Sequence, residues 1–90
     1  MHDATEIKGK WITFRRAASI GKTERWEIVA ENGAPIGSIR WYGPWRRYCF
    51  LPLEGTVYEE RCLRDIAEFC ERLTKTHKAA AKSVASITTD

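Results

Sequence analysis

Apolar and polar residues alternate in four short segments of the first half of the chain, a pattern typical of half-buried β-strands. Each segment is rich in the aromatic and β-branched residues that strands favour. The four segments cover residues 10–16, 24–31, 36–42 and 46–51. A glycine-containing loop over 17–23, then Asn32-Gly33 and Gly43-Pro44, separate them with typical turn residues. The pattern therefore predicts four consecutive antiparallel strands.

The Asn32-Gly33 pair predicts a two-residue type I′ hairpin, because both residues tolerate a positive φ. This turn would pair Trp26 with Ile39 and Arg25 with Arg40. One sheet face would then collect the aromatic and aliphatic residues, and the other face the arginines. The first set is Trp26, Ile28, Ile39, Trp41, Tyr48 and Phe50, and the second is Arg15, Arg25, Arg40 and Arg47. A shift of one residue would exchange the two faces.

Apolar residues return at helical spacing over residues 60–76. The predicted buried stripe consists of Leu63, Ile66, Ala67, Cys70 and Leu73, widened by Cys62 and Phe69. Thr56 and Glu59 have the spacing of a capping box, although a start a few residues later is equally compatible. Asp65 and Glu68 are interpreted as surface residues in ion pairs with the helix arginines. The predicted fold is α+β, a four-stranded antiparallel sheet with one C-terminal helix packed on its aromatic face.

The chain divides accordingly into three parts. Residues 1–9 are predicted to be a flexible N-terminus, residues 10–76 a single ββββα domain, and residues 77–90 a frayed helical extension followed by a polar tail. Ninety residues are enough for one domain with a modest core.

Charge and cysteine content narrow the functional classes. The net charge of +3 permits an anionic partner without demanding one. Three cysteines without a C-x-x-C pair favour a reducing compartment, and no apolar run approaches the roughly 20 residues of a membrane helix. We therefore expect a cytoplasmic protein that binds no membrane, metal or cofactor. No nucleophile system or phosphate loop is recognisable, so we expect no enzymatic activity.

The segment 40–50, RWYGPWRRYCF, is the densest candidate for a binding site. Arginine binds carboxylate or phosphate through two parallel hydrogen bonds, and aromatic rings offer stacking surfaces. Trp, Tyr and Arg are also the residues enriched in protein-binding hot spots. The candidate binding residues are Trp45, Arg46, Arg47, Arg40, Arg25 and Tyr42. The same pattern is typical of a strand with core aromatics and a solvated arginine face, and that interpretation stays open.

The motif W-Y-G-P-W-R-R-Y-C-F-x-P, followed by C-L-R-D-I-A-E-F, resembles that of small uncharacterised bacteriophage and prophage-associated proteins. The resemblance covers residues 37–73 and implies a mobile-element setting without a known activity. In that setting we expect an accessory protein that binds a host protein complex through the aromatic and arginine residues. It could be an inhibitor of host defence such as an anti-CRISPR. The alternative is a small DNA- or RNA-binding module that uses Arg25, Arg40 and Arg47.

Overall fold

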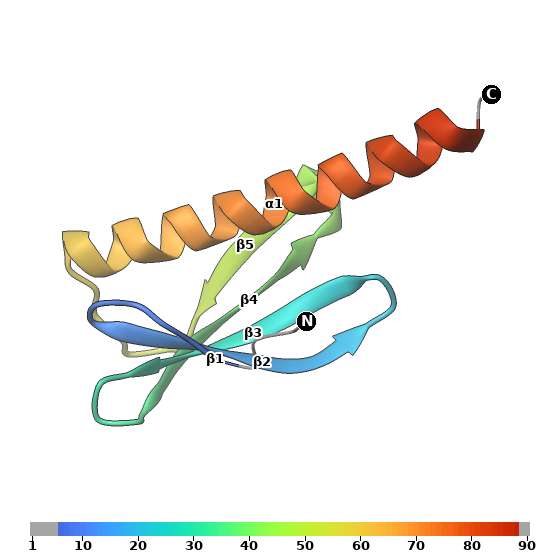
Figure 1. Cartoon of the computed structure of the whole chain (residues 1–90). Helices are drawn as coiled ribbons and strands as arrows, with labels where there is room; N and C mark the ends of the chain where they lie inside the picture. The colour runs from blue at the N-terminus through green and yellow to red at the C-terminus, as the bar shows by residue number, and fades with distance from the viewer. Residues whose placement is uncertain (1–5, 89–90) are drawn as a thin grey trace.

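The part of the chain that the structure describes forms a five-stranded antiparallel sheet with one long helix across it (Figure 1). The computed structural model describes the backbone of residues 6–88 and the side chains of residues 6–17 and 21–80. The strands are β1 (Glu6–Lys8), β2 (Ile12–Ile20), β3 (Thr23–Ala30), β4 (Pro35–Tyr42) and β5 (Arg47–Pro52), and the helix is α1 (Glu60–Thr88). Each strand pairs with its neighbour along the chain, in the order β1-β2-β3-β4-β5. The α+β class and the single C-terminal helix are confirmed.

The prediction of four strands is wrong, because Glu6–Lys8 forms an additional edge strand. Ile7 pairs with Phe14 and packs against the core, while Arg15 forms an ion pair with Glu6 at 3.4 Å. The expectation that no strand precedes residue 10 missed this, since three residues with a single apolar side chain give no alternation to detect. Residues 1–5 of the predicted flexible N-terminus lie outside the described residues.

The predicted register between β3 and β4 is confirmed, but the turn that produces it differs. Trp26 pairs with Ile39 and Arg25 with Arg40. The connection spans residues 31–34, and only Gly33 has a positive φ, of 88°, so it is not a type I′ turn. Asn32 instead accepts a hydrogen bond from the Ala34 amide through its side-chain oxygen, and a bulge before Val29 restores the register.

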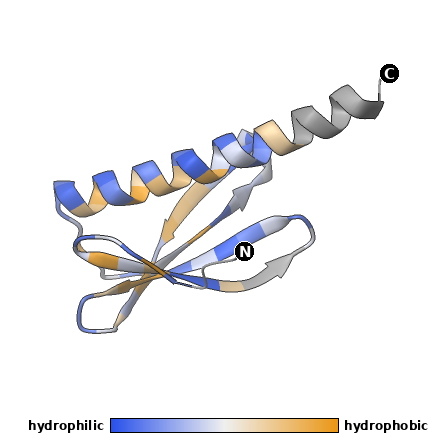
Figure 2. Cartoon of the chain, viewed as in Figure 1, coloured by the Kyte–Doolittle hydropathy of each residue, from blue (hydrophilic) through white to orange (hydrophobic). Residues whose placement is uncertain are grey.

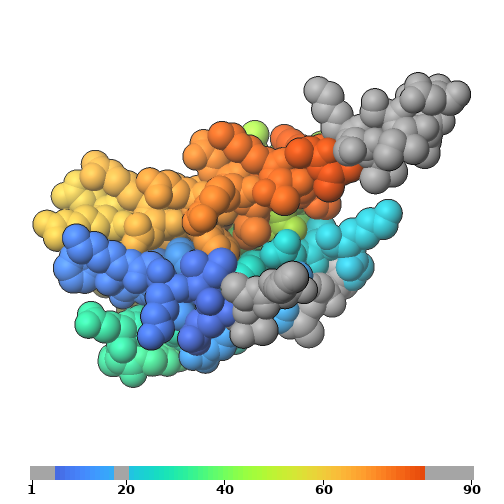
Figure 3. All heavy atoms as spheres, in the orientation of Figure 1, coloured from blue at the N-terminus to red at the C-terminus, as the bar shows by residue number. Residues whose placement is uncertain are grey.

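The helix covers the aromatic face of the sheet, as predicted. Its hydrophobic residues face the strands and its hydrophilic residues face away (Figure 2). Phe69 of α1 stacks on Phe14 at a ring distance of 4.0 Å and meets the edge of Trp26 at 4.9 Å. The buried core cluster is Ile12, Phe14, Trp26, Ile28, Ile39, Tyr48, Ile66 and Phe69. In the space-filling view, side chains of α1 lie against the N-terminal strands and close the gap that the ribbon leaves (Figure 3).

The buried stripe of α1 is rotated from the predicted one. Leu63 is 48% exposed and Ala67 is also exposed, whereas Ile66 and Phe69 are buried. Asp65 is not in a surface ion pair: one of its carboxylate oxygens is buried near Gly9 in the β1–β2 turn. The hydropathy pattern centres the stripe near Leu63. The rotation of α1 about its own axis is instead set by Phe69, which packs against the rings of Phe14 and Trp26.

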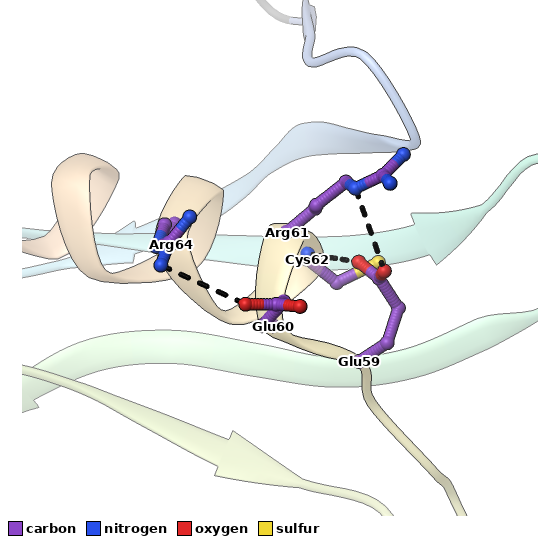
Figure 4. A network of polar contacts seen from close by, with 5 residues as sticks. All are labelled: Glu59, Glu60, Arg61, Cys62 and Arg64. Atoms are coloured by element: carbon purple, nitrogen blue, oxygen red, sulfur yellow. Dashed lines mark hydrogen bonds and ion pairs between the residues drawn. The ribbon is translucent and has the colours of Figure 1, made fainter.

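Glu59 caps the start of α1, and the predicted capping box with Thr56 is wrong. The Glu59 side chain accepts a hydrogen bond from the Cys62 amide at 2.9 Å (Figure 4). The Glu59 backbone oxygen accepts one from the Leu63 amide. The Thr56 hydroxyl is engaged instead by the Leu53 carbonyl oxygen at 2.7 Å. Figure 4 also shows the ion pair of Arg64 with Glu60 at 3.7 Å.

The helix does not end near residue 76 but continues to Thr88, through most of the segment for which a helical extension and a polar tail were predicted. The first half of the helix lies over the sheet, and its C-terminal end extends past it (Figure 1). The side chains of residues 81–88 and the last two residues of the predicted tail lie outside the described residues. Nothing in the described part of the chain forms a helix both long and apolar enough to span a membrane.

Candidate functional site

The turn between β4 and β5 holds the aromatic part of the predicted site. Gly43–Trp45 forms one turn of 3-10 helix, with Pro44 near its start where a missing amide hydrogen does no harm. Trp45 is 67% exposed and Tyr42 is 44% exposed. Their rings meet edge to face at 5.0 Å, a preferred aromatic geometry. Trp45 therefore projects into solvent while Tyr42 restricts its motion.

Arg46 ends this turn in the left-handed helical region, with φ 55° and ψ 49°. It is the one non-glycine residue with a positive φ in the described part of the chain. Its amide donates to the carbonyl oxygens of Tyr42 at 2.9 Å and Gly43 at 3.1 Å. An L-residue in this region is disfavoured by about 1–2 kcal/mol. Such strain often accompanies a functional position, and here it lies in the backbone directly after Trp45.

Arg25 and Arg40 lie on the sheet face opposite the helix, and Arg47 lies at the β5 edge of the sheet, beside α1. Arg25 pairs directly with Arg40 across β3 and β4, and Arg40 pairs with Cys49 of β5. Arg47 pairs with Tyr42 at the start of β5. Strand alternation therefore places Arg25, Arg40, Tyr42 and Arg47 on one face, with Trp45 and Arg46 at its end. We call these six residues the aromatic-arginine surface.

The arginines of this surface have no counter-ion among the residues that the structure describes. None of Arg25, Arg40, Arg46 and Arg47 forms an ion pair with a described residue, whereas Arg15, Arg61 and Arg64 each pair with a glutamate. Directly opposed like charges in a sheet are unfavourable. Glu27, two residues after Arg25 on the same face of β3, forms no ion pair with either arginine. The surface is therefore chemically suited to carboxylate or phosphate groups.

Trp41 belongs to the covered face and not to this surface. It is half-buried, meets the Tyr48 ring at 5.4 Å and packs against the His77 ring of α1 at 4.4 Å. The alternation of β4 thus separates Trp41 from Tyr42, as the register predicted.

A second group of polar residues was missed by the sequence analysis. A groove of about 630 Å³ lies between β5 and α1 and includes Arg47 together with Lys75 and Lys78 of the helix. The 75/78 spacing places two lysines on one side of a helix. The sequence shows this spacing. It does not show that this side of α1 faces β5.

Burial keeps two of the thiols protonated. Desolvation raises the pKa of Cys70 to about 11, with a smaller contribution from Cys49, and desolvation together with Glu59 raises the pKa of Cys62. Burial likewise raises the pKa of the Tyr48 hydroxyl. A protonated thiol is a poor nucleophile and a poor metal ligand. No cluster of three histidine, cysteine or acidic residues suited to a metal occurs within the described residues.

Comparison with known proteins identifies a relative encoded by a phage. The chain is 31% identical over 58 residues to an uncharacterized 9.3 kDa protein of Acholeplasma phage L2. The matched segment covers 63% of this chain and 74% of the phage protein. No protein-family model matches the chain, and no solved structure matches it.

Proposed function

This chain belongs to the same family as the uncharacterized 9.3 kDa protein of Acholeplasma phage L2, and from that premise we propose that it is a non-catalytic phage accessory protein. Its role in this proposal is to bind a protein complex of the host cell through the aromatic-arginine surface. Inhibition of a host defence complex, such as a CRISPR effector, is one form that this binding would take.

The exposure of Trp45 is the observation that carries the proposal. A tryptophan side chain buries about 150–250 Å² in an interface, and 67% of Trp45 is still available. At about 25 cal/mol per Å², covering that area contributes about 2.5–4 kcal/mol to binding. The Tyr42 ring and the fixed Arg46 turn hold the indole before the partner arrives, so little conformational freedom is lost on binding.

The arginines around Trp45 support a protein partner that carries carboxylates. Arg40, Arg46 and Arg47 are exposed and form no ion pair with a described residue. Tryptophan and arginine together are the residues that most often dominate protein interfaces. Electrostatic attraction would raise the association rate, and the buried indole would slow dissociation.

Capture from a bacterial lysate, with and without nuclease, tests the proposal. The tagged chain should retain a stoichiometric protein partner that resists nuclease, and Trp45→Ala should abolish the retention. Trp11→Ala is the matched control, since Trp11 is 38% exposed but lies in the β1–β2 turn beside Arg61. Retention that survives Trp45→Ala, or the lack of any nuclease-resistant partner, would overturn the proposal.

A nucleic-acid-binding module is the second candidate, favoured by the direct opposition of Arg25 and Arg40 without a described counter-ion. A duplex or single strand would supply phosphates to these arginines and to Arg47. Each phosphate contact releases about one counter-ion, so binding should weaken steeply with salt. The double change Arg40→Ala and Arg47→Ala should lower the salt slope by about 1.4–1.8. It should also leave thermal stability nearly unchanged, because exposed charges contribute little to folding.

A further inference from the structure

The groove between β5 and α1 has its charges separated along its length. The Tyr48 amide of β5 donates to the Thr74 hydroxyl of α1 at 2.9 Å, which fixes Arg47 beside this part of the helix. Lys75 follows Thr74 directly and Lys78 lies one turn further on, so three cations meet at this end. Glu71 and Glu68 line the groove one and two turns earlier in the helix. The groove therefore has a basic end and an acidic end.

Between the charges the groove wall is largely apolar. Tyr48, Ala67 and Cys70 line it, and the Cys70 thiol is neutral because burial raises its pKa. The five charged side chains form no ion pair with one another or with another described residue, although Glu71 and Lys75 have the spacing of a helical ion pair. Their charges are thus available to a partner.

The pattern of charges discriminates between classes of partner. A nucleic-acid strand has phosphates along its whole length, and its backbone would meet Glu68 and Glu71 in the same groove as the lysines. Like charges in close contact disfavour a complex. A peptide can place acidic residues at Arg47, Lys75 and Lys78, an apolar side chain at Cys70, and a basic or neutral residue at Glu68. The Tyr48 amide already donates its hydrogen bond to the Thr74 hydroxyl. A peptide therefore cannot add a strand to β5 at Tyr48, and it is recognised there through its side chains.

We propose that this groove binds a segment of a partner protein that combines an acidic cluster with an adjacent apolar residue. The inference rests on the proposed function, since Arg47 belongs both to the groove and to the aromatic-arginine surface. The two sites would form one interface. Trp45 would supply the apolar anchor, and the groove would select the partner by charge.

A library of random 12-residue peptides displayed on phage tests the groove directly, with the full chain as the target. Selected peptides should contain acidic clusters next to apolar residues. Their affinity, measured by fluorescence polarisation with synthetic copies, should fall at least tenfold in the double variant Lys75→Glu, Lys78→Glu. A second selection against that variant should favour basic clusters in their place. The control with the same charge change is Lys8→Glu with Lys22→Glu, two exposed lysines outside the groove.

Three results would overturn the inference. The first is a library that yields no acidic peptides, and the second is acidic peptides whose affinity both double variants reduce equally. The third is that no peptide binds the groove while a fifteen-nucleotide poly-dT strand does, and that the affinity for this strand falls at least tenfold in the double variant Lys75→Glu, Lys78→Glu. The peptide selection uses neither Trp45 nor a lysate. If the groove binds no peptide, the result of the lysate capture therefore still stands. If the Trp45→Ala variant retains the captured partner as well as the original chain does, the proposed function is refuted, whereas the peptide-binding inference is not tested by that result.

Discussion

Trp26 and Trp45 are held by opposite means, and their side chains are 4% and 67% exposed. Trp26 lies under α1, where the Phe69 ring meets it and its indole nitrogen donates to the Glu24 carboxylate at 2.9 Å. Trp45 lies in a turn where no helix covers it, and the Tyr42 ring and the Arg46 backbone fix its direction. On the covered face, order comes from packing between distant elements. On the turn, order comes from local backbone geometry and serves a contact with something else.

The largest expected effect is the contrast between these two tryptophans. Trp26→Ala should lower the free energy of unfolding by about 3–5 kcal/mol, because it leaves a large cavity under the helix. Trp45→Ala should change it by less than about 0.5 kcal/mol, as is usual for exposed positions. Urea denaturation followed by far-ultraviolet circular dichroism measures both. Equal losses would mean that Trp45 is part of the folded core.

The next contrast uses two glycines of β4 and its following turn. A Cβ added to Gly37 would lie 2.5 Å from a Phe50 ring carbon and 2.8 Å from the Leu51 carbonyl oxygen, whereas one added to Gly43 would meet nothing within 4 Å. Gly37→Ala should therefore lower the free energy of unfolding by about 1–3 kcal/mol through overpacking. Gly43→Ala should be nearly neutral in the same denaturation experiment. A neutral Gly37→Ala would show that Phe50 has room to move.

The third prediction concerns Thr74, whose hydroxyl joins α1 to β5 at the edge of the covered face. Thr74→Ala removes the acceptor of the part-buried Tyr48 amide, and an amide left without a partner costs about 1–3 kcal/mol. Thr74→Ser retains the hydroxyl and should recover most of that loss. Thr76→Ala, at an exposed position of the same helix, should have little effect. Hydrogen exchange of the Tyr48 amide should accelerate in Thr74→Ala alone.

The smallest expected effect is an increase in the free energy of unfolding, and it concerns Arg46 in the turn between β4 and β5. Arg46→Gly places a residue without a Cβ in the left-handed region and should raise the free energy of unfolding by about 0.5–1 kcal/mol. The gain is partly offset by the greater entropy of glycine in the unfolded chain. Arg47→Gly, in the adjoining strand, should lower stability instead. A loss of stability in Arg46→Gly would mean that the arginine side chain holds the turn.

The features predictable from the sequence are those encoded by near neighbours. The pairing of Arg25 with Arg40 was predicted from a two-residue turn at Asn32-Gly33, and it survived the change of turn type because the bulge before Val29 compensated. Trp45 was among the candidate binding residues of the segment 40–50, and it is exposed. These features depend on a few residues in a row.

The features missed depend on how distant elements meet. The rotation of α1 about its own axis is set by the packing of Phe69 against the rings of Phe14 and Trp26. Leu63 is therefore exposed, although it is an apolar residue like the buried Ile66. The position of Lys75 and Lys78 beside β5 depends on the same rotation. Glu6–Lys8 pairs only because β2 offers an edge. No local pattern contains these relations.

The order of strands in this sheet has a consequence for synthesis on the ribosome. Every strand pairs with its chain neighbour, so each hairpin can close soon after its second strand emerges. The helix that covers Phe14 and Trp26 is the last of these elements to be made. Until Phe69 emerges, the nascent sheet exposes its apolar face to solvent and to chaperones, and folding is completed only by the final third of the chain.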